Sequence, residues 1–250
     1  MAHRGRRRVA PASVRQPGCS SWASWGRYSK PPNSADAFCG RPISDARPWR
    51  LARLRGPVMP LSVTTEFDAD AAKSRLLQLI RERAYKDGID IVLASGKRST
   101  FYINGKKVSL HPEGLYLIGM LLLDKLKKYP EITAVGGLTM GADPLASAVA
   151  CLSHLTGRPL KAFLVRKEAK EHGTGSRIEG DLEPGEKVCV LEDTVTTGGS
   201  ALQAVEAVTD AGAEPVVIMA IADREDPDAA KFRSEQNVEC LVSLSEIRGQ

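Results

Sequence analysis

Hydrophobic periodicity becomes regular only from about residue 66 of this 250-residue chain. From Asp70 to Lys86, apolar residues recur at the spacing of one helical face, which predicts an amphipathic helix stopped by Gly88. A second helix is expected to open at Pro112 and to end before Pro130. Its predicted buried face is Leu115, Ile118, Leu122 and Leu126.

Several apolar runs have the length of strands rather than of helices. Residues 89–108 predict two strands connected by a turn at Ser95 and Gly96. Four further runs are continuously apolar, at 134–138, 161–167, 187–193 and 215–223. Helices are predicted between them, one capped by Asp143 and another over residues 201–213. Continuous apolar runs that alternate with helices predict an α/β fold with a central parallel sheet flanked by helices.

Residues 1–60 differ from the rest of the chain in composition. They hold eleven Arg and one Lys against Asp36 and Asp45, so they carry +10 of charge and the remainder carries −5. Without a hydrophobic period, this segment cannot bury enough apolar surface to fold alone. We expect a disordered extension, or sequence upstream of a start near Val58 or Met59, with a transit peptide or a basic interaction tail as alternatives. The folded domain is predicted over residues 61–250.

Composition and charge restrict the kinds of partner. Because the positive charge is confined to one segment, the basic balance does not indicate a nucleic-acid-binding protein. No run of 18 or more apolar residues is present, so no membrane-spanning helix is expected. The five cysteines show no metal-binding spacing, and Cys151 and Cys189 lie in apolar runs typical of a core. This cysteine usage suits a reducing cytoplasm.

One predicted strand runs directly into two acids, Glu192 and Asp193, and then into the loop TTGGS at 196–200. Ligands of open parallel sheets bind outside the carboxyl ends of the strands. There, loop amides, hydroxyls and a helix N-terminus can hold a phosphate. Neighbouring carboxylates suit a phosphorylated sugar whose hydroxyls they accept, with Mg²⁺ close by. A plain strand-turn-helix with surface acids is the alternative, and neither GxxxxGK[ST] nor GxGxxG occurs.

The segment 188–200 resembles the 5-phosphoribosyl 1-pyrophosphate (PRPP) signature of type I phosphoribosyltransferases. The resemblance implies the fold of that family, a central parallel sheet flanked by helices with a small N-terminal hood. It also implies a PRPP site in this segment, at Glu192, Asp193, Thr194, Val195, Thr196, Thr197, Gly198, Gly199 and Ser200. The signature identifies the sugar donor and leaves the acceptor open.

A charged stretch at 166–175 follows the predicted strand at 161–167. Four potential cations stand within seven positions there, Arg166, Lys167, Lys170 and His172. The stretch is either a solvated loop or a mobile lid whose cations neutralise a leaving pyrophosphate. Its sequence RKEAKEHG resembles the catalytic loop of orotate phosphoribosyltransferases. That resemblance implies that all four cations bind PRPP and that Lys170 and His172, together with Asp193, are catalytic.

Other segments are similar to that family. The stretch AVGGLTMGADPLA resembles the loop that receives pyrophosphate, which here is Thr139, Met140 and Gly141. LASGKRSTFYIN resembles the hood segment, which implies that Tyr102 and Ile103 contact the base. Arg224 stands where the family has an arginine for the orotate carboxylate, and Thr196 is also implied to contact orotate. From the residues alone, core packing explains Tyr102 and Ile103 equally well, and Arg224 could be an exposed arginine in an acidic turn.

This chain departs from some members of the family at two positions. Those members carry lysine where this chain has Ala94, just before the Ser-Gly of the hood, and where it has Met140, in the pyrophosphate loop. The roles of these two lysines are therefore not assigned to any residue of this chain. The cations available nearby are Lys97, Arg98 and Lys106.

The resemblance implies transfer of ribose 5-phosphate from PRPP to orotate, giving orotidine 5′-monophosphate and pyrophosphate in pyrimidine biosynthesis. It implies Mg²⁺ as cofactor, bound through the substrate, and a homodimer with shared active sites. Two other functions are considered. A phosphoribosyltransferase for a purine or another pyrimidine would not need Arg224 or the lid sequence. A regulator that binds PRPP without chemistry would not need the lid cations.

Overall fold

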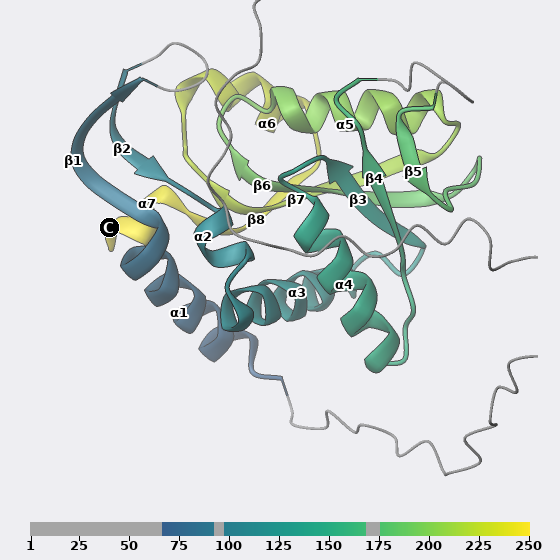
Figure 1. Cartoon of the computed structure of the whole chain (residues 1–250), viewed down its shortest axis with the longest axis horizontal. Coiled ribbons are helices and arrows are strands. Elements are labelled where there is room, and N and C mark those ends of the chain that lie inside the picture. Colours follow the sequence, from purple (N-terminus) through teal and green to yellow (C-terminus); the bar gives the residue numbers. More distant parts are fainter. Residues whose placement is uncertain (1–66, 93–97, 169–175) are drawn as a thin grey trace, which may run out of the picture. The chain divides into compact units, whose positions relative to one another are not determined.

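The computed structural model describes residues 67–92, 98–168 and 176–250, so the expectations for residues 1–60 and for the turn at Ser95 and Gly96 lie outside the described residues. Six of the described strands form one sheet in the order β5-β4-β3-β6-β7-β8 (Figure 1). They are β3 (Ala134–Leu138), β4 (Lys161–Val165), β5 (Ile178–Gly180), β6 (Lys187–Val195), β7 (Glu214–Asp223) and β8 (Val238–Ser243). Neighbouring strands are parallel except for β5, which pairs antiparallel with β4 at one edge. The predicted α/β fold with a mostly parallel sheet is confirmed.

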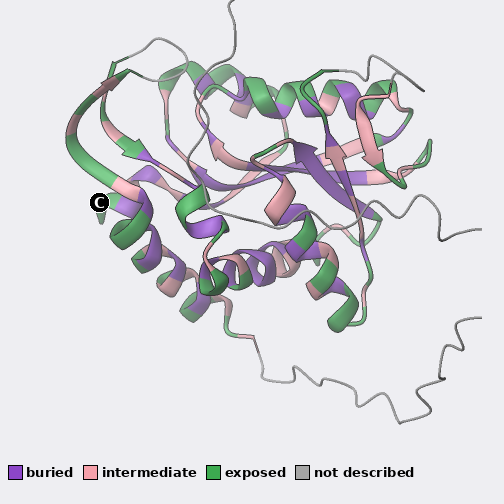
Figure 2. Ribbon diagram, viewed as in Figure 1, coloured by how far each residue is buried: buried purple, intermediate pink, exposed green. Residues whose placement is uncertain are grey.

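Helices cover both faces of this sheet, as continuous apolar strands require. One face carries α1 (Ala69–Leu79), α3 (Pro112–Leu126) and α4 (Asp143–Leu155), and the other carries α5 (Gly199–Asp210) and α6 (Ala230–Glu235) (Figure 1). Alternate residues of β6 divide between the two cores: Cys189 and Leu191 pack on the first, Val188 and Val190 on the second. Figure 2 shows the buried residues concentrated in the strands and in the helix faces turned toward them.

The first helix ends earlier than its periodicity predicts. After α1, the chain makes a π-helical turn, η1 (Ile80–Ala84), and strand β1 (Tyr85–Val92) begins at once. Gly88 does not stop the helix but lies inside β1 with φ +67°, where the pairing with β2 (Arg98–Ile103) shifts register. Glycine at a β-bulge takes this left-handed conformation without steric cost.

Two details of the next helices correct the sequence predictions. Leu115 is only partly buried in α3, whereas Leu117 beside it is buried. Asp143 is the first residue of α4 rather than its N-cap, which is Ala142, and its carboxylate accepts a hydrogen bond from the Thr139 hydroxyl at 2.8 Å. Cys151 is exposed on α4, so the expectation that it packs in the core is wrong, while Cys189 is fully buried.

The antiparallel strands β1 and β2 form a two-stranded sheet of their own, apart from the main one (Figure 1). The short helix α2 (Lys106–Ser109) follows β2 directly. The last described helix, α7 (Leu244–Arg248), is joined to this hairpin, since the Arg248 side chain donates to the Tyr85 hydroxyl at 3.0 Å. This hairpin corresponds to the predicted hood, and it places the β2–α2 junction opposite the ends of β6 and β7.

Candidate active site

An open pocket of about 410 Å³ lies at the carboxyl ends of β6 and β7, facing the β2–α2 junction. It is lined by Tyr102, Ile103, Asn104, Gly105, Lys106, Glu192, Asp193, Thr194, Thr196, Thr197, Ser200 and Arg224. Residues from three distant stretches of the chain therefore meet in one place. The position agrees with the rule that parallel sheets bind ligands beyond the carboxyl ends of their strands.

The acid pair lies near the end of β6. Because successive side chains of a strand point to opposite faces of the sheet, Glu192 and Asp193 point in different directions. Glu192 is 7% exposed, and burial, followed by the charge of Asp193, raises its pKa to about 8. One Glu192 oxygen accepts the Asp193 backbone N–H at 3.0 Å, and the other is buried without a hydrogen-bond partner in the described part of the chain. The Asp193 carboxylate accepts a hydrogen bond from the Lys106 ammonium at 2.8 Å. The pair can thus offer one oxygen atom that still needs a partner.

The glycine loop continues from the acids into α5. Thr194 to Ala201, with Glu192, line a second hollow of about 70 Å³. Gly198 is the N-cap of α5 with φ +85°, and a Cβ there would lie 2.3 Å from the Phe232 ring. Only glycine fits this position. The first amides of α5 have no acceptor within the helix, so they can bind an anion together with the loop hydroxyls.

Arg224 follows β7 and closes the opposite end of the pocket. It is 5% exposed, and this burial lowers the pKa of its guanidinium. Its guanidinium carbon lies 4.3 Å from the centre of the Phe101 ring, and one terminal nitrogen donates to the Ser99 hydroxyl at 3.2 Å. Its Nε is buried without a hydrogen-bond partner among the described residues. Arg224 is therefore held in place by the hood and retains capacity to bind an anion.

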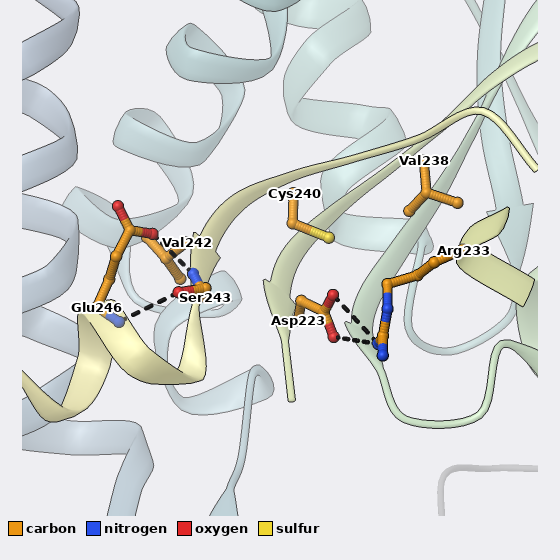
Figure 3. Close-up of a pocket in the computed structure, with 7 residues that line it drawn as sticks. All are labelled: Asp223, Arg233, Val238, Cys240, Val242, Ser243 and Glu246. Atoms are coloured by element: carbon orange, nitrogen blue, oxygen red, sulfur yellow. Dashed lines mark hydrogen bonds and ion pairs between the residues drawn. The ribbon is translucent and has the colours of Figure 1, made fainter. Parts of the chain in front are cut away.

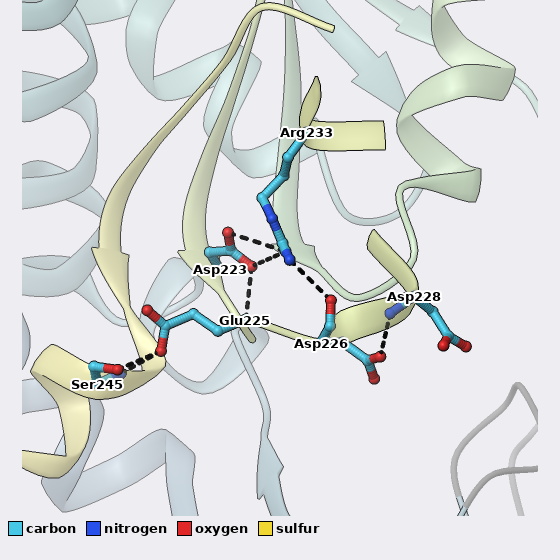
Figure 4. A network of polar contacts seen from close by, with 6 residues as sticks. All are labelled: Asp223, Glu225, Asp226, Asp228, Arg233 and Ser245. Atoms are coloured by element: carbon cyan, nitrogen blue, oxygen red, sulfur yellow. Dashed lines mark hydrogen bonds and ion pairs between the residues drawn. The ribbon is translucent and has the colours of Figure 1, made fainter. Parts of the chain in front are cut away.

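The acids around Arg224 have partners of their own (Figure 4). Asp223 accepts a hydrogen bond from Arg233 at 3.1 Å, and Glu225 accepts from the Ser245 hydroxyl at 2.6 Å. Asp226 caps the backbone of Asp228 at 3.0 Å. The alternative of an exposed arginine in an acidic turn does not describe Arg224, since it is buried in the pocket wall.

The hood contributes more side chains than the sequence predicted. Tyr102 and Ile103 both line the pocket, with Tyr102 38% exposed and Ile103 buried. Asn104 and Gly105 line it as well, and Phe101 supports Arg224 from behind. The four residues from Tyr102 to Gly105 are consecutive, so the alternation of a strand does not select them; β2 ends at Ile103, and the turn into α2 brings Asn104 and Gly105 to the pocket.

The predicted pyrophosphate loop borders the acid pair. A Cβ on Gly141 would lie 3.1 Å from a Glu192 oxygen, so the loop backbone runs against the carboxylates. Met140 is 71% exposed, and the Thr139 hydroxyl is bonded to Asp143. None of the three predicted loop residues is among those that line the main pocket.

The predicted lid is described only at its beginning. Arg166 forms an ion pair with Glu179 at 3.1 Å, and Lys167 is exposed. Neither of them lines the main pocket. Lys170 and His172 lie outside the described residues, so their predicted roles remain predictions.

A second cavity, of about 210 Å³, opens beside β8 (Figure 3). Its charged groups already have partners. Asp223 is bonded to Arg233, and Glu246 is bonded to Lys73 at 2.6 Å and to the Ser243 backbone at 2.8 Å. With its charges satisfied, this cavity is a weaker candidate for an anionic substrate than the main pocket.

Neither a cluster of metal-binding side chains nor a membrane-spanning helix is present within residues 67–92, 98–168 and 176–250. No group of three or more His, Cys, Asp and Glu side chains there is arranged to hold a metal ion. Among the same residues, every helix is too short or too polar to cross a membrane.

Comparison with known proteins identifies the family. No family model matches the chain. It is 48% identical to the orotate phosphoribosyltransferase of Synechocystis sp. over 175 residues, covering 69% of this chain and 87% of that protein. The corresponding enzyme of Aquifex aeolicus is 46% identical over 179 residues, covering 70% of this chain and 97% of that protein.

Solved structures agree with these relatives. A phosphoribosyltransferase of Corynebacterium diphtheriae is 38% identical, with a TM-score of 0.61 over 72% of this chain and 99% of that chain. An orotate phosphoribosyltransferase of Mycobacterium tuberculosis, solved in complex with PRPP, is 34% identical, with a TM-score of 0.58 over 71% of this chain and 99% of that chain. The chain therefore belongs to the orotate phosphoribosyltransferase family.

Proposed function

We propose that this protein transfers ribose 5-phosphate from PRPP to orotate, forming orotidine 5′-monophosphate and pyrophosphate. One observation carries the proposal: an acid pair, a glycine-rich helix N-terminus and a buried arginine converge on a single pocket. These groups match the hydroxyls, the phosphate and the carboxylate of the two substrates. The names of the relatives and the PRPP complex of the Mycobacterium enzyme support the same reaction.

The loop and the acid pair would hold PRPP. Backbone amides and hydroxyls of Thr196 to Ser200 bind the 5′-phosphate, and the carboxyl groups of Glu192 and Asp193 bind the ribose hydroxyls. As the bond to pyrophosphate breaks, positive charge develops on the ribose ring, and the nearby Asp193 carboxylate stabilises it. Because burial raises the pKa of Glu192 to about 8, the protonated Glu192 carboxyl can donate a hydrogen bond to one ribose hydroxyl oxygen at neutral pH, while the Asp193 carboxylate accepts a hydrogen bond from a hydroxyl.

Orotate would lie between the hood and Arg224. The guanidinium presents planar donors that match a carboxylate, and the Phe101 ring fixes its plane. Tyr102 and Ile103 form the wall against which the flat base packs, and Thr196 can contact it from the loop. Attack by the orotate nitrogen on the face opposite the pyrophosphate inverts the anomeric carbon.

The leaving pyrophosphate needs positive charge. We propose that Arg166, Lys167, Lys170 and His172 supply it from the lid, and that the loop Thr139 to Gly141 receives the group. We propose that Mg²⁺ is bound through the substrate, and the carboxyl and hydroxyl groups that line the pocket are oxygen donors of the kind that Mg²⁺ prefers. When bound, the ion would neutralise charge on the pyrophosphate.

We further propose a cytoplasmic homodimer with shared active sites, in which residues 1–60 are dispensable for catalysis. The free thiols of Cys151, Cys189 and Cys240 are compatible with a reducing compartment. Light scattering would show twice the chain mass, and cell fractionation would recover the protein with the cytoplasm. Mixing inactive Lys170→Ala with inactive Asp193→Asn protein would restore activity if the lid serves the partner's site. Protein that starts at Met59 would keep the full rate.

The reaction is tested by following orotate consumption by ultraviolet absorbance with PRPP and Mg²⁺. Adenine, hypoxanthine and uracil are offered in parallel. We expect turnover of orotate alone. Use of another base in place of orotate would refute the role given to Arg224. Binding of PRPP without turnover of any base would instead support a regulator.

A further inference from the structure

Positive charge is scarce in the described walls of the pocket. Of the twelve residues that line it, Lys106 and Arg224 are cationic. Arg224 stands at the end given to orotate, against Phe101. Met140, an exposed and uncharged residue, brings no charge to the predicted pyrophosphate loop. Lys106 is therefore the described cation that faces the acid pair.

The fold places Lys106 against the acids through a close backbone approach. Lys106 is the first residue of α2, and its Nζ lies 2.8 Å from an Asp193 oxygen, 87 residues away in sequence. A Cβ on the preceding Gly105 would lie 3.3 Å from the Thr194 hydroxyl and 3.4 Å from the Asp193 Cβ. The absence of a side chain at Gly105 lets the turn approach β6 closely enough for this ion pair.

The surroundings of the pair make this contact more than a surface salt bridge. The Asp193 side chain is 17% exposed, and Lys106 is 45% exposed and open to the pocket. The hydrogen bond to Asp193 raises the pKa of Lys106, which therefore stays charged at neutral pH. Burial is the main reason that the pKa of Glu192 is raised; the charge of Asp193 raises it further, and the charge of Lys106 lowers it. Tyr102 raises the pKa of Lys106 slightly.

We propose that Lys106 is a positioning residue for PRPP: its ammonium fixes the Asp193 carboxylate toward the ribose site and offsets the charge of the acid pair. This inference rests on the proposed function of the same pocket. PRPP carries several negative charges, and the Asp193 carboxylate without a counter-charge would repel it. Lys106 lets the acids receive ribose hydroxyls while the polyanion stays bound.

The test compares Lys106→Met, Lys106→Arg and the control Lys107→Met. Lys107 lies next in α2, is exposed and does not line the pocket. We expect Lys106→Met to weaken PRPP binding at least tenfold, measured by calorimetry, and to raise the KM for PRPP equally, with the KM for orotate within twofold of the wild type. Lys106→Arg should stay within threefold of the wild type, and Lys107→Met within twofold.

A pH profile separates this role from a merely structural one. Glu192 acts in its protonated form, so kcat/KM for PRPP should fall as pH rises through the pKa of Glu192. Removing the charge that lowers this pKa should move that descending limb to higher pH in Lys106→Met, and leave it in place in Lys107→Met. Unchanged PRPP binding in folded Lys106→Met, or weaker binding with an unmoved limb, would overturn the inference. Calorimetry measures PRPP binding without turnover. Absence of orotate turnover in the wild type would therefore count against the proposed reaction alone.

Discussion

Gly198 occupies a position where the phosphate loop and the packing of α6 impose the same requirement. Its φ of +85° is a conformation that costs about 1–2 kcal/mol for a residue with a Cβ. A Cβ there would also lie 2.3 Å from Cγ of Phe232, a side chain that is 5% exposed. Phe232 cannot turn away without leaving the core, so Gly198→Ala must shift the loop.

The two costs can be separated. Overpacking of a core costs about 1–3 kcal/mol, so Gly198→Ala should lower the free energy of unfolding by about 2–5 kcal/mol in total. In a Phe232→Ala background the collision is gone, and the same substitution should cost only about 1–2 kcal/mol. The difference is the coupling between the two positions, expected at about 1–3 kcal/mol. Gly199→Ala is the matched control, because its nearest contact would be the Thr197 hydroxyl oxygen at 3.7 Å.

The wild type, Gly198→Ala, Phe232→Ala and the double variant form a double-mutant cycle. Urea unfolding of these four proteins and of Gly199→Ala measures the free energies of unfolding. Gly199→Ala should stay within about 0.5 kcal/mol of the wild type. Because the loop moves in Gly198→Ala, PRPP binding should also weaken at least tenfold. An equal cost of Gly198→Ala with and without the Phe232 ring would refute the collision as the reason for glycine here.

Three further predictions concern the site. Arg224→Lys should lower kcat/KM for orotate by about tenfold to a hundredfold, because one charged hydrogen bond is lost, with the KM for PRPP little changed in steady-state assays. Phe101→Leu removes the ring under Arg224 and should raise the KM for orotate roughly threefold to tenfold, an effect that should vanish in an Arg224→Lys background. Glu192 has a folded pKa of about 8, above its ordinary value of 4.5, so the native state binds the extra proton between these values and stability falls as pH rises from about 5 to 8. Glu192→Gln should lose that dependence in urea unfolding, and a parallel pH dependence in both proteins would contradict the assignment.

The sheet could be predicted because its strands are continuously apolar and alternate with helices. The predicted runs 187–193 and 215–223 agree with the bounds of β6 and β7 to within two residues at each end. The edge strands β5 and β8 were not predicted. The short β5 carries little pattern, and the side chains of β8 are partly buried in an irregular order. The end of the first helix was misplaced because Gly88 signals either a helix stop or a bulge, and only pairing with β2 decides between them.

The candidate site, too, could be predicted from the sequence only in part. The acids, the glycine loop and Arg224 are local signals, and the structure gathers them in one pocket. The contacts of Lys106 with Asp193 and of Phe101 with Arg224 join residues far apart in sequence. Such contacts depend on how the hood folds over the sheet, which no periodicity encodes.

A crystal structure of the protein with PRPP and Mg²⁺ would test the central claim most directly, since it reveals where each part of the donor lies. We predict the 5′-phosphate on the backbone amides of Thr196 to Ser200, and the ribose hydroxyls on Glu192 and Asp193. We also predict that the face of the ribose at which orotate attacks the anomeric carbon is turned toward Arg224. PRPP bound outside this pocket, or with its 5′-phosphate away from the glycine loop, would contradict the account.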